Sequence, residues 1–410
     1  MIHKNQNRPV SVVMVGTGGY GHYYTQLLIK EYHRGLIDIR AAVEPFPDQS
    51  SHSSWFLKQS IPVYSNLEQV YEDHLNPDLV IISSPIHCHV PQSLLSLKQG
   101  SHVLCDKPLA STVQDALQMV KIKNKTKFHL MVGYQWSYTS SIQALKKDIH
   151  KGLFGKPLQM KTLCLWPRGW EYYRRNDWAG KVKDEQGHWI LDSPANNAMA
   201  HFLHNLLYLL GDQKHTSALP CSVEAEAYKA YSIDNFDSIA CRLLIDDGVT
   251  LLFYASHTVQ NSLGPLFKLE FENATITYGE TAKKILCQDQ NGTIKDYGNP
   301  DSENQFKKFY ESIKVIKNLT PAVCGPEAAY PHTLAVNGIQ ESVPEPGVFP
   351  SRSKVKSQSE ERLWIKNWGE TLYNCYLNSS LPSERKIKWA KKGKQIDLRN
   401  YRFFPGGDLK

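Results

Sequence analysis

The 410-residue sequence predicts an α/β protein whose N-terminal part is a parallel sheet covered by helices on both faces. Three observations support this fold class. Apolar runs of strand length alternate with helical stretches from Val10 to about Val132, as in successive βαβ units. The first run breaks into a glycine-rich turn. A later region carries strand-like runs separated by turn residues such as Asp246-Asp247-Gly248.

The elements of the first region follow from this alternation. The predicted strands are Val10–Val15, Ile37–Val43, Leu79–Ser83, His102–Cys105 and Phe128–Val132. The predicted helices are Gly19–Glu31, Asp48–Gln59, Leu67–His74, Val90–Gln99 and Val113–Asn124. Ligands of such sheets bind beyond the carboxyl ends of the strands, so polar residues at those ends are candidates for a site.

The glycine-rich turn has the pattern G-x-G-x-x-G, and its residues are Gly16, Thr17, Gly18, Gly19, Tyr20 and Gly21. After a strand and before a helix, the first glycine permits a tight turn. The second lets the backbone approach a diphosphate, and the third lets helix and strand pack closely. We therefore expect this dinucleotide-binding (Rossmann) loop to hold the diphosphate at the helix N-terminus. The alternative is a glycine-rich turn in another α/β protein.

Glu44 follows the second predicted strand, about 23 residues after Gly21. A carboxylate at this offset can bind the ribose hydroxyls of NAD and repel the 2′-phosphate of NADP. No Arg or Lys directly follows Glu44, and Arg40 within the strand is a weaker candidate for holding that phosphate. We therefore expect NAD rather than NADP.

Two polar clusters follow the third and fourth strands: Ser83 to His89, and Asp106-Lys107-Pro108. His87, Cys88 and His89 alternate along a turn without a further ligand at suitable spacing, so we expect no metal site. A partly desolvated lysine near a cationic nicotinamide loses affinity for its proton and can serve in proton transfer. Lys107 is therefore a candidate catalytic residue, and the alternative is a surface lysine.

The order of these motifs resembles the glucose–fructose oxidoreductase/inositol dehydrogenase (Gfo/Idh/MocA) family. The similar residues are the glycine pattern, Ser84-Pro85-x-x-x-His89, Asp106-Lys107-Pro108-Leu109-Ala110 and Val132-Gly133-Tyr134-Gln135-Trp136. The similarity runs from about residue 10 to residue 345. It implies that Ser84, His89, Lys107 and Gln135 contribute to cofactor binding.

The resemblance also implies a second α/β domain with a large open, mostly antiparallel sheet. Strand-like runs agree with this: Pro157–Leu165, Ser222–Tyr231, Ser238–Ile245, Thr250–His257, Leu266–Glu272, Thr275–Tyr278 and Lys284–Gln288. We expect a Rossmann domain at 1–130, a substrate-binding and oligomerisation domain at 131–345, and a linker, C-terminal helix and basic tail at 346–410. Helices would cover one face of the sheet and leave the other for a homodimer or homotetramer.

Aromatic residues and arginines gather between Trp166 and Trp189. Aromatic faces with Arg donors suit a sugar or polyol, whose C–H faces stack while its hydroxyls need directional partners. The candidate substrate residues are Trp166, Arg168, Tyr173 and Trp178. The alternative is a packing or interface loop.

The stretch from Pro194 predicts a helix that carries Asn197, His201 and His204 on one face. It resembles the family helix Asp-x-x-x-His-x-x-Asp, in which the His exchanges a proton with the substrate hydroxyl. The resemblance makes His201 the catalytic base and gives Asn197 and His204 substrate-binding places. Both depart from the usual Asp, so the usual negative charge is missing.

Composition narrows the class of protein further. No run is long and apolar enough to span a bilayer, the first seven residues lack the apolar core of a signal peptide, and the 8 cysteines are scattered. We expect a cytoplasmic protein without membrane contact. The net charge of +7 is concentrated in the tail without a nucleic-acid motif, so we expect no nucleic-acid partner.

The sequence thus predicts an NAD-dependent oxidoreductase of carbohydrate metabolism that acts on a secondary hydroxyl of a sugar, glycoside or cyclitol. Two other hypotheses stay open. One is a redox-neutral glycoside hydrolase or lyase that uses NAD at the same site. The other is a non-catalytic NAD-binding regulator on the same fold.

Overall fold

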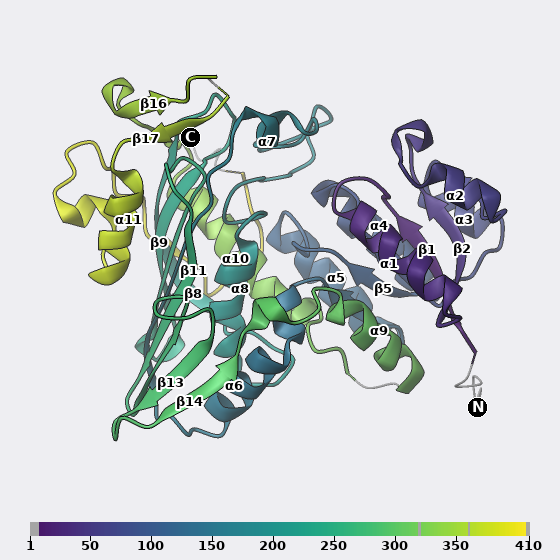
Figure 1. Cartoon of the computed structure of the whole chain (residues 1–410), viewed down its shortest axis with the longest axis horizontal. Coiled ribbons are helices and arrows are strands. Elements are labelled where there is room, and N and C mark those ends of the chain that lie inside the picture. Colours follow the sequence, from purple (N-terminus) through teal and green to yellow (C-terminus); the bar gives the residue numbers. More distant parts are fainter. Residues whose placement is uncertain (1–7, 319–320, 360, 407–410) are drawn as a thin grey trace. The chain divides into compact units, whose positions relative to one another are not determined.

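The computed structural model describes residues 8–318, 321–359 and 361–406 (Figure 1). The chain divides into two compact units. Unit 1 is Met1–Ala110, Asp115–Tyr138 and Asn304–Glu327, and unit 2 is Ser111–Gln114, Thr139–Glu303 and Ala328–Lys410. Residues 1–7, where the sequence predicted no signal peptide, lie outside the described part.

Unit 1 contains a six-stranded parallel sheet of order β3-β2-β1-β4-β5-β6. This order is that of doubly wound dinucleotide-binding folds, so the Rossmann prediction is confirmed. The strands are β1 (Val10–Val15), β2 (Ile37–Val43), β3 (Val63–Tyr64), β4 (Leu79–Ile82), β5 (His102–Cys105) and β6 (Leu130–Val132).

The helices of unit 1 include one from a distant part of the chain. The first set is α1 (Gly21–His33), α2 (Ser53–Lys58), α3 (Leu67–Glu72), α4 (His89–Lys98) and most of α5 (Val113–Lys125). Helix α9 (Lys307–Asn318) joins them, and its Phe309 and Ile313 enter the same buried cluster as Met14, Ile81 and Leu104. The core of unit 1 therefore needs residues from two separated stretches of sequence.

Unit 2 is built on one large sheet of order β14-β13-β12-β11-β7-β10-β9-β8-β15, with β18 (Ile396–Asp397) also paired to β8. All pairs are antiparallel except β7–β10 and β8–β15. The predicted large, mostly antiparallel sheet is confirmed. Its strands are β7 (Pro157–Leu165), β8 (Pro220–Lys229), β9 (Ser238–Ile245), β10 (Thr250–Ser256), β11 (Leu263–Phe271), β12 (Ala274–Tyr278), β13 (Ile285–Asp289), β14 (Ile294–Gly298) and β15 (Gly347–Val348).

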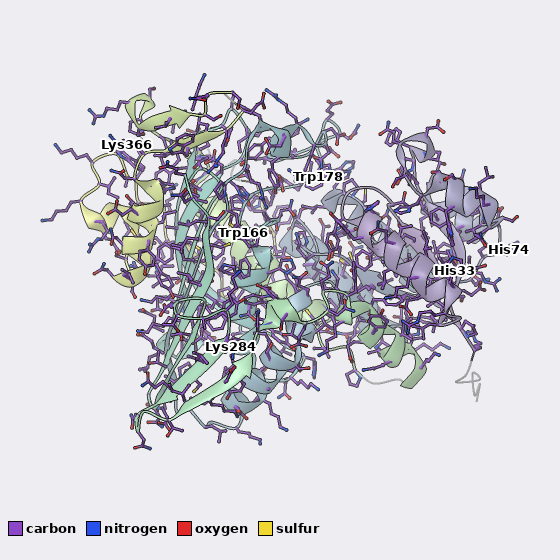
Figure 2. All side chains as sticks on the ribbon, in the orientation of Figure 1. His33, His74, Trp166, Trp178, Lys284 and Lys366 are labelled. Atoms are coloured by element: carbon purple, nitrogen blue, oxygen red, sulfur yellow. The ribbon has the colours of Figure 1, made fainter. Side chains whose placement is uncertain are left out.

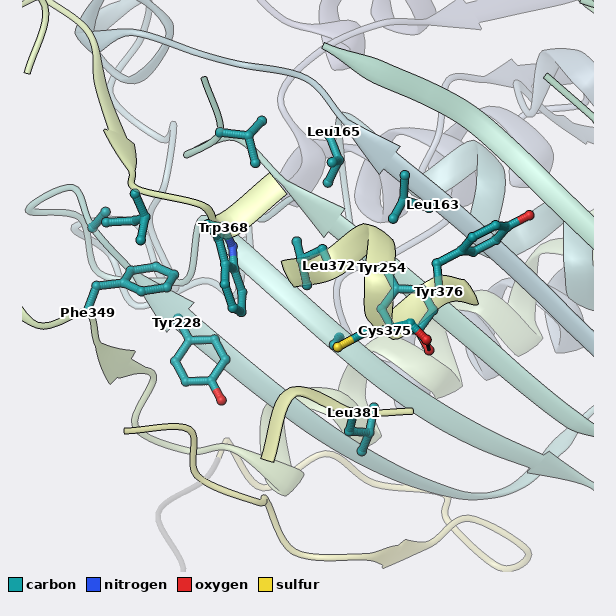
Figure 3. Packing of buried hydrophobic residues seen from close by; sticks show 14 of the residues in the cluster. Leu163, Leu165, Tyr228, Tyr254, Phe349, Trp368, Leu372, Cys375, Tyr376 and Leu381 are labelled. Carbon is teal, nitrogen blue, oxygen red and sulfur yellow. Dashed lines mark hydrogen bonds between the residues drawn. The ribbon is translucent and has the colours of Figure 1, made fainter. Parts of the chain in front are cut away.

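Helices cover both faces of this sheet (Figure 1). Helices α6 (Ser140–His150), α8 (Ala200–Leu209) and α10 (Pro326–Ser342) lie on one side, and α11 (Trp368–Leu377) lies on the other. Alternate strand residues such as Leu163, Tyr228 and Tyr254 pack against α11 (Figure 3). The expectation that one face would be left open is therefore wrong for β7 to β10, because the C-terminal segment covers it.

Polar contacts fix that segment on the sheet. Arg242 of β9 forms two 2.8 Å bonds with the two carboxylate oxygens of Glu384. The Tyr254 hydroxyl lies 3.1 Å from the carbonyl oxygen of Cys375, at the end of α11. Within the stretch predicted as a linker, β15 extends the sheet, and β16 (Lys354–Lys356) pairs with β17 (Leu363–Ile365). No helix in the described ranges is long and apolar enough to cross a bilayer.

Candidate active site

The glycine loop of unit 1 connects β1 to α1, and two of its glycines are required by packing. A Cβ at Gly16, which has φ of +80°, would lie 2.9 Å from the carbonyl oxygen of Ser83. A Cβ at Gly21 would lie 2.0 Å from the carbonyl oxygen of Gly16. A Cβ at Gly18 would meet nothing within 4 Å, and Gly18 and Gly19 are exposed. Internal packing therefore does not require the second glycine.

Two further features of this loop suit a dinucleotide. Helix α1 has Tyr20 at its N-cap without a side-chain cap from the described chain, so its N-terminal N–H groups can bind an anion. Glu44, at the end of β2, accepts hydrogen bonds from the Thr17 backbone at 3.0 Å and the Thr17 hydroxyl at 2.8 Å. Arg40 pairs with Asp38 at 3.1 Å on the surface. These residues fit NAD, because a carboxylate at the end of β2 can bind ribose hydroxyls and would repel the 2′-phosphate of NADP.

The loops after β4 and β5 are joined by His89. Its Nδ1 lies 2.8 Å from the carbonyl oxygen of Pro108, and its Nε2 lies 3.0 Å from that of Ser84. Burial lowers the pKa of His89, against the effect of these two bonds. The Ser84 hydroxyl donates to Gln92 at 2.6 Å. His89 thus fixes the loop that carries Lys107 to the neighbouring loop.

Lys107 is the second residue after β5 and is partly buried. Its neighbour Asp106 has a buried partner that the sequence did not indicate. The Nζ of Lys308, on α9, lies 3.2 Å from Oδ1 of Asp106, and Lys308 is 1% exposed. The same Nζ lies 4.8 Å from the ring centre of Tyr20 and 4.9 Å from that of Tyr24. Burial alone would lower the pKa of Lys308, but Asp106 and the tyrosines outweigh it and raise this pKa above its ordinary value.

Lys308 therefore connects the glycine loop, through Tyr20, to the residue before Lys107. Gln135 begins the short helix η3 (Gln135–Tyr138), three residues after the end of β6, and is partly buried. Across the described residues, no group of three or more His, Cys, Asp or Glu side chains could hold a metal ion.

In unit 2, the predicted helix begins later than expected. Helix α8 starts at Ala200, so Asn197 lies in the preceding turn and does not share a helix face with His201 and His204. His201 is in the first turn of α8 and partly exposed, whereas His204 is 1% exposed and stacks on Tyr208. Burial and its cationic neighbours hold the pKa of His204 well below its usual value, so this ring is neutral.

Asp192 is a further residue that the sequence did not single out. It is 2% exposed, and its Oδ1 accepts a 2.7 Å hydrogen bond from Asn197, while Oδ2 accepts one of 2.6 Å from the Gly180 backbone. A buried carboxylate thus lies beside Asn197, which stands where the family helix has Asp. Asp192 therefore places a carboxylate within hydrogen-bond distance of the Asn197 side chain.

The aromatic segment divides into core and partly exposed residues. Tyr173 is 8% exposed and packs in the core of unit 2 with Tyr231. Trp166 follows β7 and meets Phe202 of α8 edge to face, and Trp178 lies in the loop after α7 (Trp170–Arg174) (Figure 2). The Arg168 guanidinium lies 5.2 Å from the Tyr172 ring centre. Trp166, Arg168 and Trp178 are therefore the partly accessible members of the predicted set.

A family model described as "Oxidoreductase family, NAD-binding Rossmann fold" (GFO_IDH_MocA) matches residues 10–134, which contain the glycine loop, Glu44 and Lys107. This stretch matches the Gfo/Idh/MocA family model. The predicted recognition is thereby confirmed over these residues, which carry the dinucleotide-binding fold.

Similarity to curated proteins is limited to part of their length. A glycosyl hydrolase family 109 protein of Shewanella pealeana is 28% identical over 170 residues, which are 40% of this chain and 36% of the relative. The levoglucosan dehydrogenase of Pseudarthrobacter phenanthrenivorans is 29% identical over 126 residues, which are 28% of this chain and 32% of the relative. The chain thus spans about a third of the length of these relatives.

Solved structures match over most of the chain. The WlbA dehydrogenase from Bordetella pertussis, in complex with NADH and UDP-GlcNAcA, superposes with a TM-score of 0.68 at 19% identity, covering 82% of this chain and 97% of the other. A levoglucosan dehydrogenase in complex with NADH and levoglucosan gives 0.67 at 16% identity, with 82% and 98% coverage. At these identities the likeness shows that both units share the fold of these enzymes.

Proposed function

We propose that the protein is an NAD-dependent oxidoreductase that interconverts a secondary hydroxyl and a ketone on a sugar, glycoside or cyclitol. Lys107 carries the proposal. It follows the carboxyl end of β5 in the same sheet as the glycine loop, and His89 and Lys308 hold the backbone and the carboxylate beside it. A lysine placed in this way suits proton transfer at a nicotinamide site rather than solvent exposure.

The chain's residues take the following roles. The loop from Gly16 to Gly21 holds the diphosphate and Glu44 the adenosine ribose, and Ser84, His89 and Gln135 complete the cofactor site. Bound NAD would supply the acceptor for the hydride of the substrate carbinol. His201 is assigned as the general base that takes the hydroxyl proton, and Lys107 as the second residue for proton transfer.

Substrate binding is assigned to unit 2. Trp166 and Trp178 offer aromatic faces for the C–H faces of a sugar ring, and Tyr173 supports them from the core. Asn197, held by Asp192, binds a substrate hydroxyl, and His204 supports His201 from the buried side of α8. Names of similar proteins agree with a sugar substrate: levoglucosan dehydrogenase and 1,5-anhydro-D-fructose reductase are among them.

The test is NADH formation at 340 nm across a panel of sugars, glycosides and cyclitols. With an active substrate, Lys107→Ala and His201→Ala should each lower kcat about 100-fold or more, because general acid–base catalysis contributes at least this factor. NADH affinity should stay within about threefold. Lys98→Ala, an exposed lysine at the end of α4, is the matched control. Near-normal turnover by Lys107→Ala would refute the assignment.

A redox-neutral hydrolase or lyase is the second candidate, because a glycosyl hydrolase family 109 protein and an alpha-N-acetylgalactosaminidase are among the curated relatives. This candidate predicts cofactor that co-purifies and sugar product without net NADH. NAD binding without turnover of any panel member would instead favour a regulator.

Location and assembly complete the proposal. All 8 cysteines are free thiols, which suits the reducing cytoplasm. A homodimer or homotetramer would have to use a surface other than the sheet face covered by α11. Sedimentation velocity measures the assembly state directly.

A further inference from the structure

We propose that the substrate carries an anionic group, a carboxylate or a phosphate, and that Arg168 and Arg175 bind it. The inference rests on the proposed oxidoreductase function and deepens it by naming a substrate class. It uses only residues of unit 2, in the aromatic segment between β7 and α8.

The backbone of Arg168 is held by hydrogen bonds, and its guanidinium forms no ion pair with the residues that the structure describes. Its N–H donates to the carbonyl oxygen of His257 at 3.0 Å, and its carbonyl oxygen accepts from the Tyr231 hydroxyl at 2.6 Å. Its Nε is buried and has no hydrogen-bond partner among the residues that the structure describes. The ion pairs of this segment involve other arginines, Arg174 with Glu361 and Arg175 with Asp192. A partly buried guanidinium whose Nε lies away from solvent and has no partner is costly, so we infer that a ligand anion satisfies it.

Arg168 and Arg175 lie against the same aromatic ring. The Arg175 guanidinium lies 3.8 Å from the ring centre of Tyr172, and that of Arg168 lies 5.2 Å from it. Arg175 also donates to the backbone carbonyl of Tyr172, which fixes its orientation. Stacking on one ring holds both planar groups in place and leaves their N–H edges for a ligand.

Among the described residues, the surrounding carboxylates form an ion pair with Arg175 and none with Arg168. Asp192 lies 3.9 Å from Arg175, and its two oxygens also accept hydrogen bonds from Asn197 and Gly180. Asp237 is held by the backbone N–H groups of Ala230 and Tyr231. His257 packs on Tyr172, and burial, aided by the two arginines, lowers its pKa to about 3, so it adds no charge at neutral pH. Arg168 is therefore the arginine of this cluster that lacks an ion-pair partner among the described residues, while Arg175 is paired with Asp192.

The chemistry of guanidinium narrows the ligand. Its planar fork donates two parallel hydrogen bonds to a carboxylate or phosphate, and these charge-assisted bonds are about twice as strong as neutral ones. A neutral polyol would leave the partly buried Arg168 without a counterion. An acidic or phosphorylated sugar satisfies it.

Thermal unfolding of the full-length protein tests this in sodium chloride, acetate and phosphate at equal ionic strength. Acetate or phosphate should raise Tm by at least about 2 °C over chloride in the wild type. Arg168→Met should abolish that gain, and Arg168→Lys should retain part of it. Arg174→Met is the control, since Arg174 is 65% exposed and pairs at the surface. If acetate raises Tm more than phosphate, the ligand group is a carboxylate; if phosphate raises it more, the group is a phosphate.

Two results would overturn the proposal: equal gains in the wild type and Arg168→Met, or an equal loss in Arg174→Met. Arg168→Met should also raise Tm in chloride, because it removes an uncompensated charge, and a fall of Tm would assign Arg168 a packing role instead. NADH formation from a neutral sugar, unchanged by Arg168→Met, would reject the anionic substrate and leave the oxidoreductase standing. If anions stabilise the protein specifically but no sugar yields NADH, the anion site is supported and the oxidoreductase function is rejected.

Discussion

The Nζ of Lys308 lies 3.2 Å from Oδ1 of Asp106, although 202 residues separate the two in sequence. Lys308 is almost completely buried, and it also donates to the carbonyl oxygen of Gly133 at 3.4 Å. A buried charge pair of this kind is costly to break from one side, because the remaining partner is left charged and desolvated. The pair thus ties α9 to the segment that carries Lys107.

Lys308→Met should lower the free energy of unfolding by about 3–5 kcal/mol. The double variant Lys308→Met/Asp106→Asn should recover much of this loss, because no unpaired charge remains. Urea unfolding measures both. Lys314→Met, on the same helix but 63% exposed, should cost less than about 1 kcal/mol. Equal effects of the two single variants would contradict the role given to Lys308.

Gly18→Ala and Gly21→Ala should separate ligand binding from packing. Space is open at Gly18, so its variant should keep the wild-type Tm but bind NADH at least about tenfold more weakly, since the methyl group takes the place of an approaching diphosphate. At Gly21 the added carbon would clash with the backbone of Gly16, so Tm itself should fall. Differential scanning fluorimetry and NADH fluorescence titration measure the two effects. Unchanged NADH affinity in Gly18→Ala would argue against a dinucleotide here.

Trp368→Ala should destabilise unit 2 by about 3–5 kcal/mol, because it empties a fully buried aromatic site on the sheet. The ring contacts Tyr228, Phe349 and Trp389, whose centres lie 5.2–5.6 Å away. Urea unfolding reports the loss, and sedimentation velocity reports association through the uncovered face. Leu377→Ala, on the same helix at 51% exposure, is the control and should change little.

The buried carboxyl of Asp237 should make the free energy of unfolding depend on pH. Burial raises its pKa from 3.8 to about 6, although hydrogen bonds from Tyr231, Ala230, Thr258 and Ser238 oppose this. Between these values the folded protein holds a proton that the unfolded chain releases, so this contribution is complete below pH 3.8 and is lost as pH rises through 6. It amounts to about 3 kcal/mol.

Asp237→Asn should remove this contribution. The stability of the variant relative to wild type should then rise with pH between about 4 and 6 in urea titrations. For the control Asp234→Asn, at an exposed position nearby, the free energy of unfolding should change with pH as it does in the wild type. Parallel profiles for both variants would show that Asp237 does not titrate in this range.

Local sequence patterns were enough to predict the strands whose residues are continuously apolar or alternate between apolar and polar. The predicted bounds of β1, β2, β5, β7 and β9 match the structure, because these strands are buried and set their own periodicity. The two-residue strands β3 and β15 have no such pattern, since they form only where a neighbouring strand offers its edge. The cover provided by α11 likewise depends on tertiary packing, although the helix itself was predicted.

The residues of the candidate site also divide into those that local sequence predicts and those that only the folded structure reveals. The glycine loop, Glu44 and Lys107 follow from local sequence and from their place at strand ends. The start of α8 was misplaced, because Ser193 bonds to the backbone N–H groups of Asn196 and Asn197 and forms a turn before the helix. Lys308 and Asp192 are recognisable only from their partners in space, which one sequence does not reveal.

The placement of α9 has a consequence for the order in which the protein can mature during synthesis. The last strand of the unit 1 sheet, β6, leaves the ribosome about 175 residues before Lys307, so Phe309 and Ile313 are absent when the sheet first collapses. A nascent chain or a fragment that stops at residue 303 would expose the apolar surface that they cover, and Asp106 would lack its lysine. A peptide of residues 304–327 added in trans should therefore rescue such a fragment, as in a split reporter.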